Sequence, residues 1–233
     1  EMPERYVPFF TQAGISLPDE QYYREDAFAP IREAFVQHVE RMLTLAKIAD
    51  PAGSATRIMD LETRVASHHW DNVKSRDAVA TYNLKSWAEI RQLAGVDLEP
   101  WRDAVAPGHP DAFAEVVVSQ PSFLEGLGSL LVPDRLDDWK AWLRAQVVHA
   151  AAPYLTDDFV QENFSFYGTE LTGVPSIRER WKRGVSLTEG AMGEAIGKVY
   201  VERHYPPTAK AAMDELVANL IEAYRRSITD LEW

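Results

Sequence analysis

The histidines are the residues of this chain best suited to bind zinc, because the sequence contains no cysteine. A helical zinc-peptidase site needs His-Glu-x-x-His, since a spacing of four places both imidazoles on one face and the Glu activates the bound water. No two histidines here lie three or four positions apart, and His38-Val39-Glu40 has the wrong spacing. The sequence therefore predicts no local helical zinc site. The histidines are His38, His68, His69, His109, His149 and His204.

The densest cluster of polar and aromatic residues is His68-His69-Trp70-Asp71. These residue types could hold a metal or take part in acid–base chemistry. Adjacent residues of a helix point about 100° apart, so His68 and His69 would not easily share one ion. We therefore favour a structural role, with one ring in the core and the other at the surface.

The sequence offers no activated nucleophile and no convincing phosphate loop. It has neither a Gly-x-Ser-x-Gly motif nor a thiol. Gly190, Gly193 and Gly197 are spaced by three and four, no strand precedes them, and Lys198 does not complete a Walker pattern. We expect these glycines to lie on one helix face and to let another helix approach closely.

Basic residues gather at one place in an otherwise acidic chain. We call these four residues the basic cluster: Arg178, Arg180, Lys182 and Arg183. The cluster could bind a peptide carboxylate or an acidic side chain. It could equally be a solvated helix face with salt bridges to Glu179 and Glu189, which is usual for charge runs. Trp181 is expected to point into the core.

Composition limits the class of protein. The 233 residues are 46% hydrophobic, which is ample for a core, while a net charge of -12 argues against nucleic-acid binding. No apolar run reaches the ~18–20 residues that a membrane span needs. The sequence begins at Glu1 without a signal peptide, so we expect an internal start, with any targeting segment upstream. The compartment stays open between the cytoplasm and export from a bacterial cell.

The pattern of apolar residues is mainly helical. Only Tyr6–Phe10 near the start resembles a strand, and Pro8 confines it to a sheet edge. From Pro30 onward, apolar residues recur at spacings of three and four, as on one helix face. In the first helix this stripe is Ile31, Phe35, Val39, Met42, Leu43 and Ala46; in the second it is Ile58, Leu61, Val65 and His69; in the last it is Met213, Leu216, Val217, Leu220, Tyr224, Ile228 and Leu231.

Local signals mark the boundaries of the expected helices. Ser54 is expected to cap the second helix, and Val116–Val118 could be helix or strand. The remaining signals are the capping boxes Ser86-Trp87-Ala88-Glu89 and Ser176-Ile177-Arg178-Glu179, helix starts at Pro121 and Pro133, a helix over 134–152, and a boundary at Pro206-Pro207. Because the connections are short and no linker is evident, we expect one mostly helical domain over residues 1–233, with at most a short edge strand near its start.

Five separated blocks of the sequence are informative when they are taken together. They are Gly14 to Tyr23, Asp60-Leu61-Glu62 with Ala66, Tyr82-Asn83-Leu84, Val116 to Leu124, and Phe166-Tyr167-Gly168 through Tyr200-Val201. In this order, along nearly the whole chain, they resemble the neprilysin-type zinc metallopeptidases, closest to bacterial members of the mycobacterial type. Gly184 departs from the vertebrate pattern, which has a Cys there.

The resemblance implies a mainly helical, multi-helix capping lobe that closes a chamber and restricts access to small peptides. Zinc, its ligands and the general base would belong to a catalytic lobe beyond Trp233, so no catalytic or metal residue and no cofactor is expected in this chain. Its expected partners are that missing lobe and peptide substrates, with no nucleic acid and no membrane span. The resemblance makes the basic cluster a candidate for lining the substrate chamber.

Two other hypotheses stay open at the level of sequence. One is a stand-alone helical protein-interaction module, which the uncapped helix end at Ile228 to Trp233 argues against. The other is an independent hydrolase that uses scattered Asp, Glu and His, for which the spacing offers no support. We expect a fragment of a larger peptidase that is inactive alone.

Overall fold

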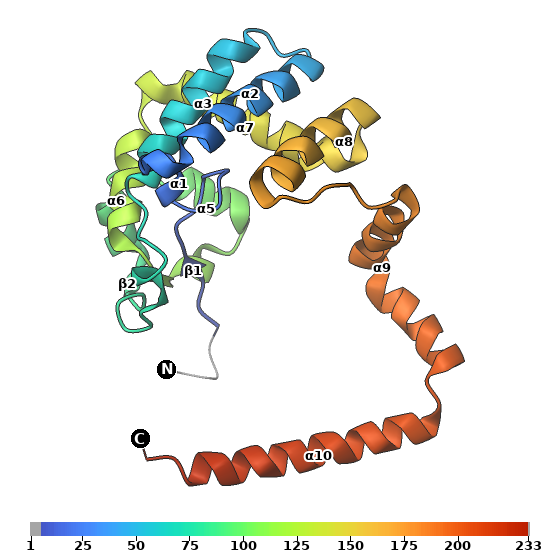
Figure 1. Cartoon of the computed structure of the whole chain (residues 1–233). Helices are drawn as coiled ribbons and strands as arrows, with labels where there is room; N and C mark the ends of the chain where they lie inside the picture. The colour runs from blue at the N-terminus through green and yellow to red at the C-terminus, as the bar shows by residue number, and fades with distance from the viewer. Residues whose placement is uncertain (1–5, 233) are drawn as a thin grey trace. The chain divides into compact units, whose positions relative to one another are not determined.

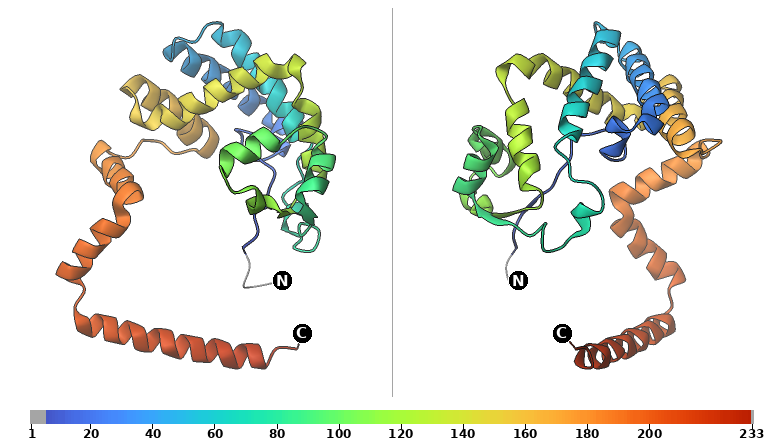
Figure 2. Two further views of the ribbon diagram at one scale, coloured as in Figure 1. Left: turned by 180° about the vertical axis from the view of Figure 1, so that it is seen from behind. Right: turned by 60° about the vertical axis from the view of Figure 1, so that its left-hand side comes forward.

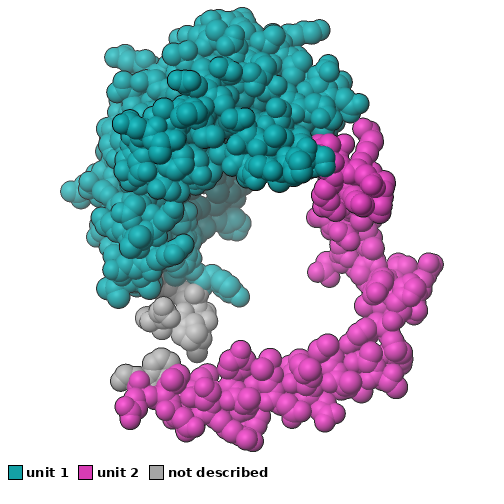
Figure 3. All heavy atoms as spheres, viewed as in Figure 1, with its two compact units in different colours: residues 1–176 teal, residues 177–233 magenta. Residues whose placement is uncertain are grey.

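Helices account for most of the chain, as the sequence predicts, and the elements group into two units. The computed structural model describes residues 6–232. Unit 1 is residues 1–176 and unit 2 is residues 177–233, and Figure 3 colours their atoms separately. That the whole chain is a single domain stays a prediction. No helix among the described residues has the length and apolar character needed to cross a membrane.

Figure 1 labels most elements of the two units. In unit 1 the strands and main helices are β1 (Phe9–Phe10), α1 (Gln21–Arg24), α2 (Ala29–Leu45), α3 (Pro51–Ala66), β2 (Leu84–Ser86), α4 (Trp87–Ala94), α5 (Glu99–Val105), β3 (Glu115–Val118), α6 (Pro121–Leu130), α7 (Leu136–Ala151), α8 (Asp157–Phe164) and the π-helix η6 (Ser165–Glu170). In unit 2 they are α9 (Arg180–His204) and α10 (Pro207–Thr229).

A small sheet, larger than the single edge strand expected, holds the start of the chain. Its order is β1-β3-β2, so β1 lies at an edge as Pro8 predicts, parallel to β3. The carbonyl oxygen of Pro8 accepts a hydrogen bond from Val117 N at 3.0 Å, and the amide that proline lacks is not needed there. Val116–Val118, which could have been helix or strand, is the buried central strand, as suits β-branched residues.

The main core lies between α2, α3 and α7, which run close together in Figure 1 and in both views of Figure 2. The stripes predicted on the first two helices supply it: Phe35 and Leu43 from α2 meet Ile58 from α3, and each is 1% exposed. Burying a side chain of this size stabilises the fold by about 1.5–3 kcal/mol. A second cluster, around Ile90 and Val116, joins α4 to the sheet.

Two of the helix starts expected in unit 1 are confirmed. Ser86 and Glu89 form the predicted capping box: Glu89 N donates to Ser86 Oγ at 3.3 Å, and Ser86 N donates to the Glu89 carboxylate at 2.8 Å. α6 begins at Pro121, as predicted. Pro133 instead opens a short 3-10 turn, Pro133–Arg135, that leads into α7.

Two expected caps are wrong. α3 is capped by Asp50, whose carboxylate accepts a hydrogen bond from Gly53 N at 3.1 Å, while Ser54 is buried within the first turn. Asp50 adopts a left-handed backbone (φ 52°), which places its carboxylate over the first amides of the helix. The proposed box at Ser176 does not form, because Glu179 is extended (ψ 142°) and α9 starts only at Arg180.

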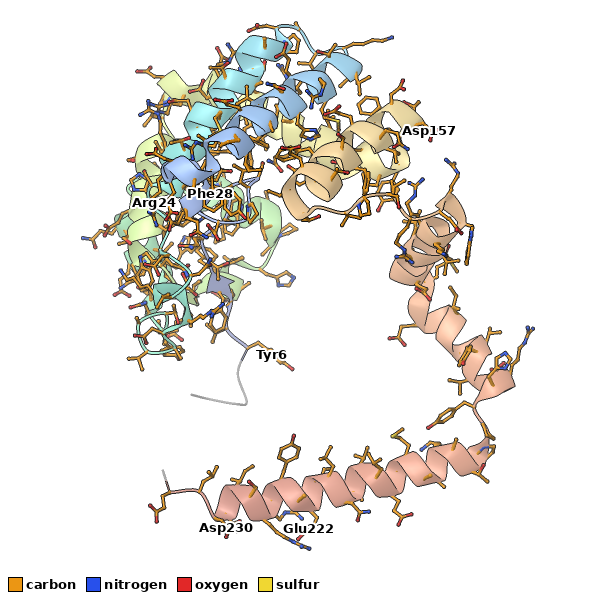
Figure 4. All side chains as sticks on the ribbon, in the orientation of Figure 1. Tyr6, Arg24, Phe28, Asp157, Glu222 and Asp230 are labelled. Atoms are coloured by element: carbon orange, nitrogen blue, oxygen red, sulfur yellow. The ribbon has the colours of Figure 1, made fainter. Side chains whose placement is uncertain are left out.

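Unit 2 contains no buried residue in the part that the structure describes. α9 is interrupted at Met192 (φ -136°, ψ 20°), where Figure 2 shows a bend. α10 starts at Pro207, as the Pro206-Pro207 pair predicts. Its side chains project on all sides of the helix in Figure 4. The helices of unit 2 therefore form from local signals without a core of their own.

Candidate functional site

The basic cluster surrounds the start of α9. Lys182 Nζ lies 3.6 Å from the Glu179 carboxylate, which is the ion pair expected for a solvated face. Arg183 Nε donates to the carbonyl oxygen of Arg178 at 3.2 Å. Within the described residues neither Glu189 nor Arg180 has an ion-pair partner. The structure thus brings the four basic residues together at an exposed helix start, and their role in lining a chamber stays a prediction.

Trp181 is not in a core, contrary to the expectation from sequence. Its side chain is 64% exposed, and its ring nitrogen donates to the Glu179 carboxylate. Lys182 Nζ lies 5.3 Å from the centre of the ring. The expectation fails because unit 2 offers no core for the ring to enter. The Glu179 carboxylate therefore links the indole to the basic cluster.

The helices of unit 2 carry long, exposed apolar faces. On α10 the predicted seam is present, and its members are between 44% and 61% exposed: Met213, Leu216, Val217, Leu220, Tyr224 and Ile228. Elsewhere α10 carries ion pairs, such as Lys210 with Asp214 at 2.7 Å and Arg226 with Glu222 at 3.1 Å. Soluble proteins rarely expose contiguous apolar patches of more than a few hundred Å² unless a partner covers them.

The glycines of α9 meet no neighbour in the described residues. A Cβ atom added at Gly190, Gly193 or Gly197 would lie in open space. The close helix packing expected from their spacing is therefore absent within this chain. Genuine close packing occurs instead at Gly128, where a Cβ would lie 1.7 Å from the carbonyl oxygen of Ala94, and at Gly126, where it would meet the ring of His68.

His68 and His69 both pack against neighbouring residues, although not with one ring in the core and the other at the surface as expected. Both rings are half-buried, because α3 ends at Ala66 and the pair lies in the turn that follows. The ring of His69 packs edge-on against Phe123, with centroids 4.9 Å apart, and its Nε2 lies 3.2 Å from the carbonyl oxygen of Ala13. Burial lowers the pKa of His69. Trp70 Nε1 donates to Ser122 Oγ at 2.7 Å.

Sequence reasoning missed a buried polar centre at Glu62, which is 0% exposed. Its carboxylate accepts four hydrogen bonds: from Ser16 N at 3.0 Å, Ser16 Oγ at 2.6 Å, Tyr23 OH at 2.6 Å and Trp142 Nε1 at 2.9 Å. Gln146 donates in turn to Ser16 Oγ at 3.0 Å. This network fastens the turn before α1 to α3 and α7.

Burial and hydrogen bonding act in opposite directions on the pKa of the Glu62 carboxyl. Burial raises the pKa of the Glu62 carboxyl, and the donors from Ser16, Tyr23 and Trp142 oppose that rise. Burial, followed by the charge of Glu62, raises the pKa of the Tyr23 hydroxyl well above its usual range. Tyr23 therefore stays a neutral donor. A signal was available in the sequence, because Glu62 follows Ile58 by four positions and lies on the apolar stripe of α3.

No group of three or more His, Cys, Asp or Glu side chains that could hold a metal ion occurs within residues 6–232. The six histidines lie in four different parts of unit 1 and at the end of α9, and the contacts above engage two of them in packing. The side chains of residues 6–232 therefore form no ligand set of the kind that holds zinc.

The sequence of this chain matches a known peptidase family along its whole length. The match is to the family model for the N-terminal region of peptidase family M13, and it covers residues 1–233. The chain therefore belongs to peptidase family M13, which confirms the resemblance inferred from the sequence blocks.

One relative is similar to this chain in both structure and sequence, and another is similar in sequence. The open state of zinc metalloprotease ZMP1 from Mycobacterium tuberculosis matches with a TM-score of 0.85 and 48% identity, over 98% of this chain and 36% of that chain. The crystal structure of the same enzyme with an inhibitor matches with a TM-score of 0.84 and 46% identity, over 98% of this chain and 35% of that one. Human endothelin-converting enzyme 1 is 25% identical, over 95% of this chain and 30% of its own length.

The chain spans only about a third of the length of the relatives it matches. A putative zinc metalloproteinase of Streptococcus gordonii is 25% identical over 94% of this chain, and the match covers 39% of that protein. The fold described above is thus that of the N-terminal region of M13 peptidases.

Proposed function

We propose that this chain is the non-catalytic lobe of a zinc metalloendopeptidase and forms part of the wall of a chamber that admits only small peptides. Its membership of family M13 and its coverage of about a third of its relatives support the proposal. The sequence lacks His-Glu-x-x-His, so the zinc ion and the general base would come from the rest of a longer polypeptide, which we call the parent.

The observation that carries the proposal is the pair of uncovered apolar helices in unit 2. α9 and α10 expose large apolar residues along their lengths, yet neither has a buried residue. Isolated helices of this kind are marginal in water, and most helical stability in proteins comes from packing an amphipathic face. We infer that the rest of the parent covers these faces.

In this role the lobe contributes shape and a few polar contacts. A chamber that excludes water strengthens electrostatic interactions at the reacting centre, and its walls exclude folded proteins by size. We propose that the basic cluster lines this chamber and attracts the carboxylates of peptide substrates. An exposed cluster of one sign of charge raises the local concentration of oppositely charged ligands.

Hydrolysis and zinc content test the proposal. The 233-residue chain and the parent are assayed side by side with quenched fluorescent short peptides, and zinc is measured by mass spectrometry. We expect the parent to be active with bound zinc, and the chain alone to have neither activity nor stoichiometric zinc. Hydrolysis with tight zinc binding by the chain alone would contradict the proposal. A reading frame that stops near Trp233 would favour the stand-alone interaction module instead.

The chamber-lining role has its own test in the parent. Replacing Arg180 and Lys182 by Ala should raise KM for peptides that carry acidic residues by about three- to tenfold, with a smaller effect on neutral peptides. Lys210→Ala is the matched control, because Lys210 is also an exposed lysine, on α10, and already pairs with Asp214. If the double variant at Arg180 and Lys182 and the control Lys210→Ala change KM equally, the basic cluster does not line the chamber.

A further inference from the structure

Two histidines, on α2 and α7, contact the segment formed by α8 and η6 near the end of unit 1. This segment precedes residues 171–176 and then unit 2. His38 belongs to α2 and His149 to α7, and both contact the segment. The proposed function uses neither histidine.

His38 is enclosed by the segment and is 3% exposed. Its Nδ1 lies 2.9 Å from the Glu162 carboxylate of α8. The imidazole stacks on Phe166 with centroids 4.9 Å apart and an angle of 14° between the planes. Tyr167 packs edge-on against it, with centroids 5.4 Å apart. The side chain of His38 thus contacts three residues of the segment, which are Glu162, Phe166 and Tyr167.

His149 makes a parallel contact from α7. Its Nδ1 lies 3.1 Å from Asn163 Oδ1, and because a carbonyl oxygen only accepts, this nitrogen carries the hydrogen. Its ring also packs against Tyr167, with centroids 4.6 Å apart. The π-helical backbone of η6 places the consecutive residues Phe166 and Tyr167 against these rings. Such wide turns are rare and are often found at functional sites.

The space around His38 is too small to hydrate added charge. A cavity of about 20 Å³ lies beside His38 and His149, with Ser16, Gln146 and Tyr167 also in its lining. A cavity of this size holds about one water molecule. A second proton on His38, which is 3% exposed, would therefore add a charge and a donor with little solvent to receive them, whereas the ring of His149 is only half-buried.

The charged and titratable groups that face His38 come from α2, α7, α8 and η6. The Glu162 carboxylate favours a charged ring, but it is shared with the guanidinium of Arg41 at 2.9 Å. Burial lowers the pKa of His38, with Glu162 opposing and the charges of His149 and Arg41 adding to the decrease. Burial also lowers the pKa of His149, opposed by Asn163.

Tyr167 stays neutral, because burial and the charge of Glu62 raise the pKa of its hydroxyl above the usual range. It therefore adds no negative charge that would hold a protonated histidine in place.

We propose that the docking of α8 and η6 on α2 and α7 is a pH-sensitive latch, closed while His38 and His149 are neutral and released when they take up protons. The undocked histidines bind protons near their ordinary value of 6.5, whereas the docked ones resist protonation. The latch is therefore strong above that value and weakens as the pH falls through it. Its release loosens the segment from which the chain continues into unit 2. This inference does not depend on the proposed function.

Hydrogen exchange followed by mass spectrometry tests the latch in the 233-residue chain. Exchange of residues 157–170 is compared with that of α3 at about pH 7.5 and about pH 5.5, after correction for the intrinsic rate at each pH. We expect opening of 157–170 to become more frequent at the lower pH, by up to about tenfold from His38, with a smaller addition from the less buried His149. α3 should show no comparable change.

Matched variants identify the residue responsible. His38→Asn keeps a donor near the position of Nδ1 but cannot be protonated, so it should remove most of the acid response of residues 157–170. His109→Asn alters an exposed histidine and should leave that response intact. If His38→Asn does not fold, NMR titration of the native histidines replaces it, and His38 should then titrate below 6.5 together with a change at the Tyr167 ring.

Four results would overturn the latch. The first is exchange of 157–170 that does not change between the two pH values. The second is an equal acid response in α3, which would show general unfolding. The third is a full acid response in His38→Asn, and the fourth is a native His38 that titrates at or above 6.5.

Discussion

Unit 1 and unit 2 are built from helices with similar apolar stripes, but only unit 1 buries them. Leu61 on α3 is 0% exposed, whereas Leu220 on α10 is 49% exposed. Both leucines lie on a stripe with spacings of three and four. The comparison shows that such a pattern identifies a face that requires a partner and does not say where the partner lies. For unit 1 the partner is within this chain, and for unit 2 we propose that it is in the parent.

The largest expected difference concerns these two leucines. Leu61→Ala should lower the free energy of unfolding by about 2–5 kcal/mol, because it leaves a cavity between α3 and its neighbours. Leu220→Ala should change it by no more than about 0.5 kcal/mol in the 233-residue chain. Urea denaturation followed by circular dichroism measures both. Similar losses for the two variants would show that α10 is packed within this chain.

A second pair of substitutions compares buried and exposed carboxylates. Glu62→Gln places an amide donor among groups that all donate, so it should cost about 1–3 kcal/mol of unfolding free energy. Glu222→Gln, on α10, removes a surface ion pair with Arg226 and should cost less than about 1 kcal/mol. The same denaturation assay applies, and a cost at Glu62 no greater than at Glu222 would contradict the network around Ser16.

The pH dependence of stability should separate the units further. His38 has a lowered pKa in the folded chain, so its contribution is complete above 6.5 and is lost as the pH falls toward the folded value. The loss for one histidine is at most about 1.4 kcal/mol per pH unit. The contribution of Glu62 to stability has the opposite pH dependence: because its pKa is raised, that contribution is complete at low pH and is lost as the pH rises. The urea midpoint is therefore measured at several pH values for the native chain and for His38→Asn. The difference between the two midpoints at each pH isolates the contribution of His38. A difference that is constant with pH would refute the assignment.

The smallest expected effect lies in the basic cluster. Lys182→Ala removes an exposed ion pair with Glu179 and should change the unfolding free energy by about 0–1 kcal/mol. Added salt should reduce even that difference. A loss comparable to that of Leu61→Ala would mean that the start of α9 is packed rather than solvated, and would weaken its candidacy as a chamber wall.

Features that depend on neighbouring residues were predictable from the sequence. The stripe of α2, the capping box at Ser86 and the helix starts at Pro121 and Pro207 all rest on contacts within one or two turns. The edge position of β1 followed from Pro8 alone. Local chemistry fixes these features, so one sequence is enough to find them.

Features that depend on distant packing were not predictable in the same way. Ser54 has the right chemistry for a cap, but Asp50 takes that place and Ser54 is buried. Trp181 has the character of a core residue, but its partner is not in unit 2. The π-helix η6 has no known sequence signal. The burial of Glu62 and His38 could have been predicted, because each polar side chain interrupts an apolar stripe. Glu62 lies between Ile58 and Val65 on one stripe, and His38 lies between Phe35 and Met42 on the other.

Hydrogen exchange of α10 in the 233-residue chain and in the parent tests the central claim most directly. If unit 2 is the part of a capping lobe that the rest of the parent covers, amides of 207–229 should exchange quickly in the chain alone and at least about a hundredfold more slowly in the parent. The α3 amides, whose core is complete in unit 1, should exchange alike in both. Equal exchange of α10 in the two proteins would show that nothing in the parent covers it and would contradict the account.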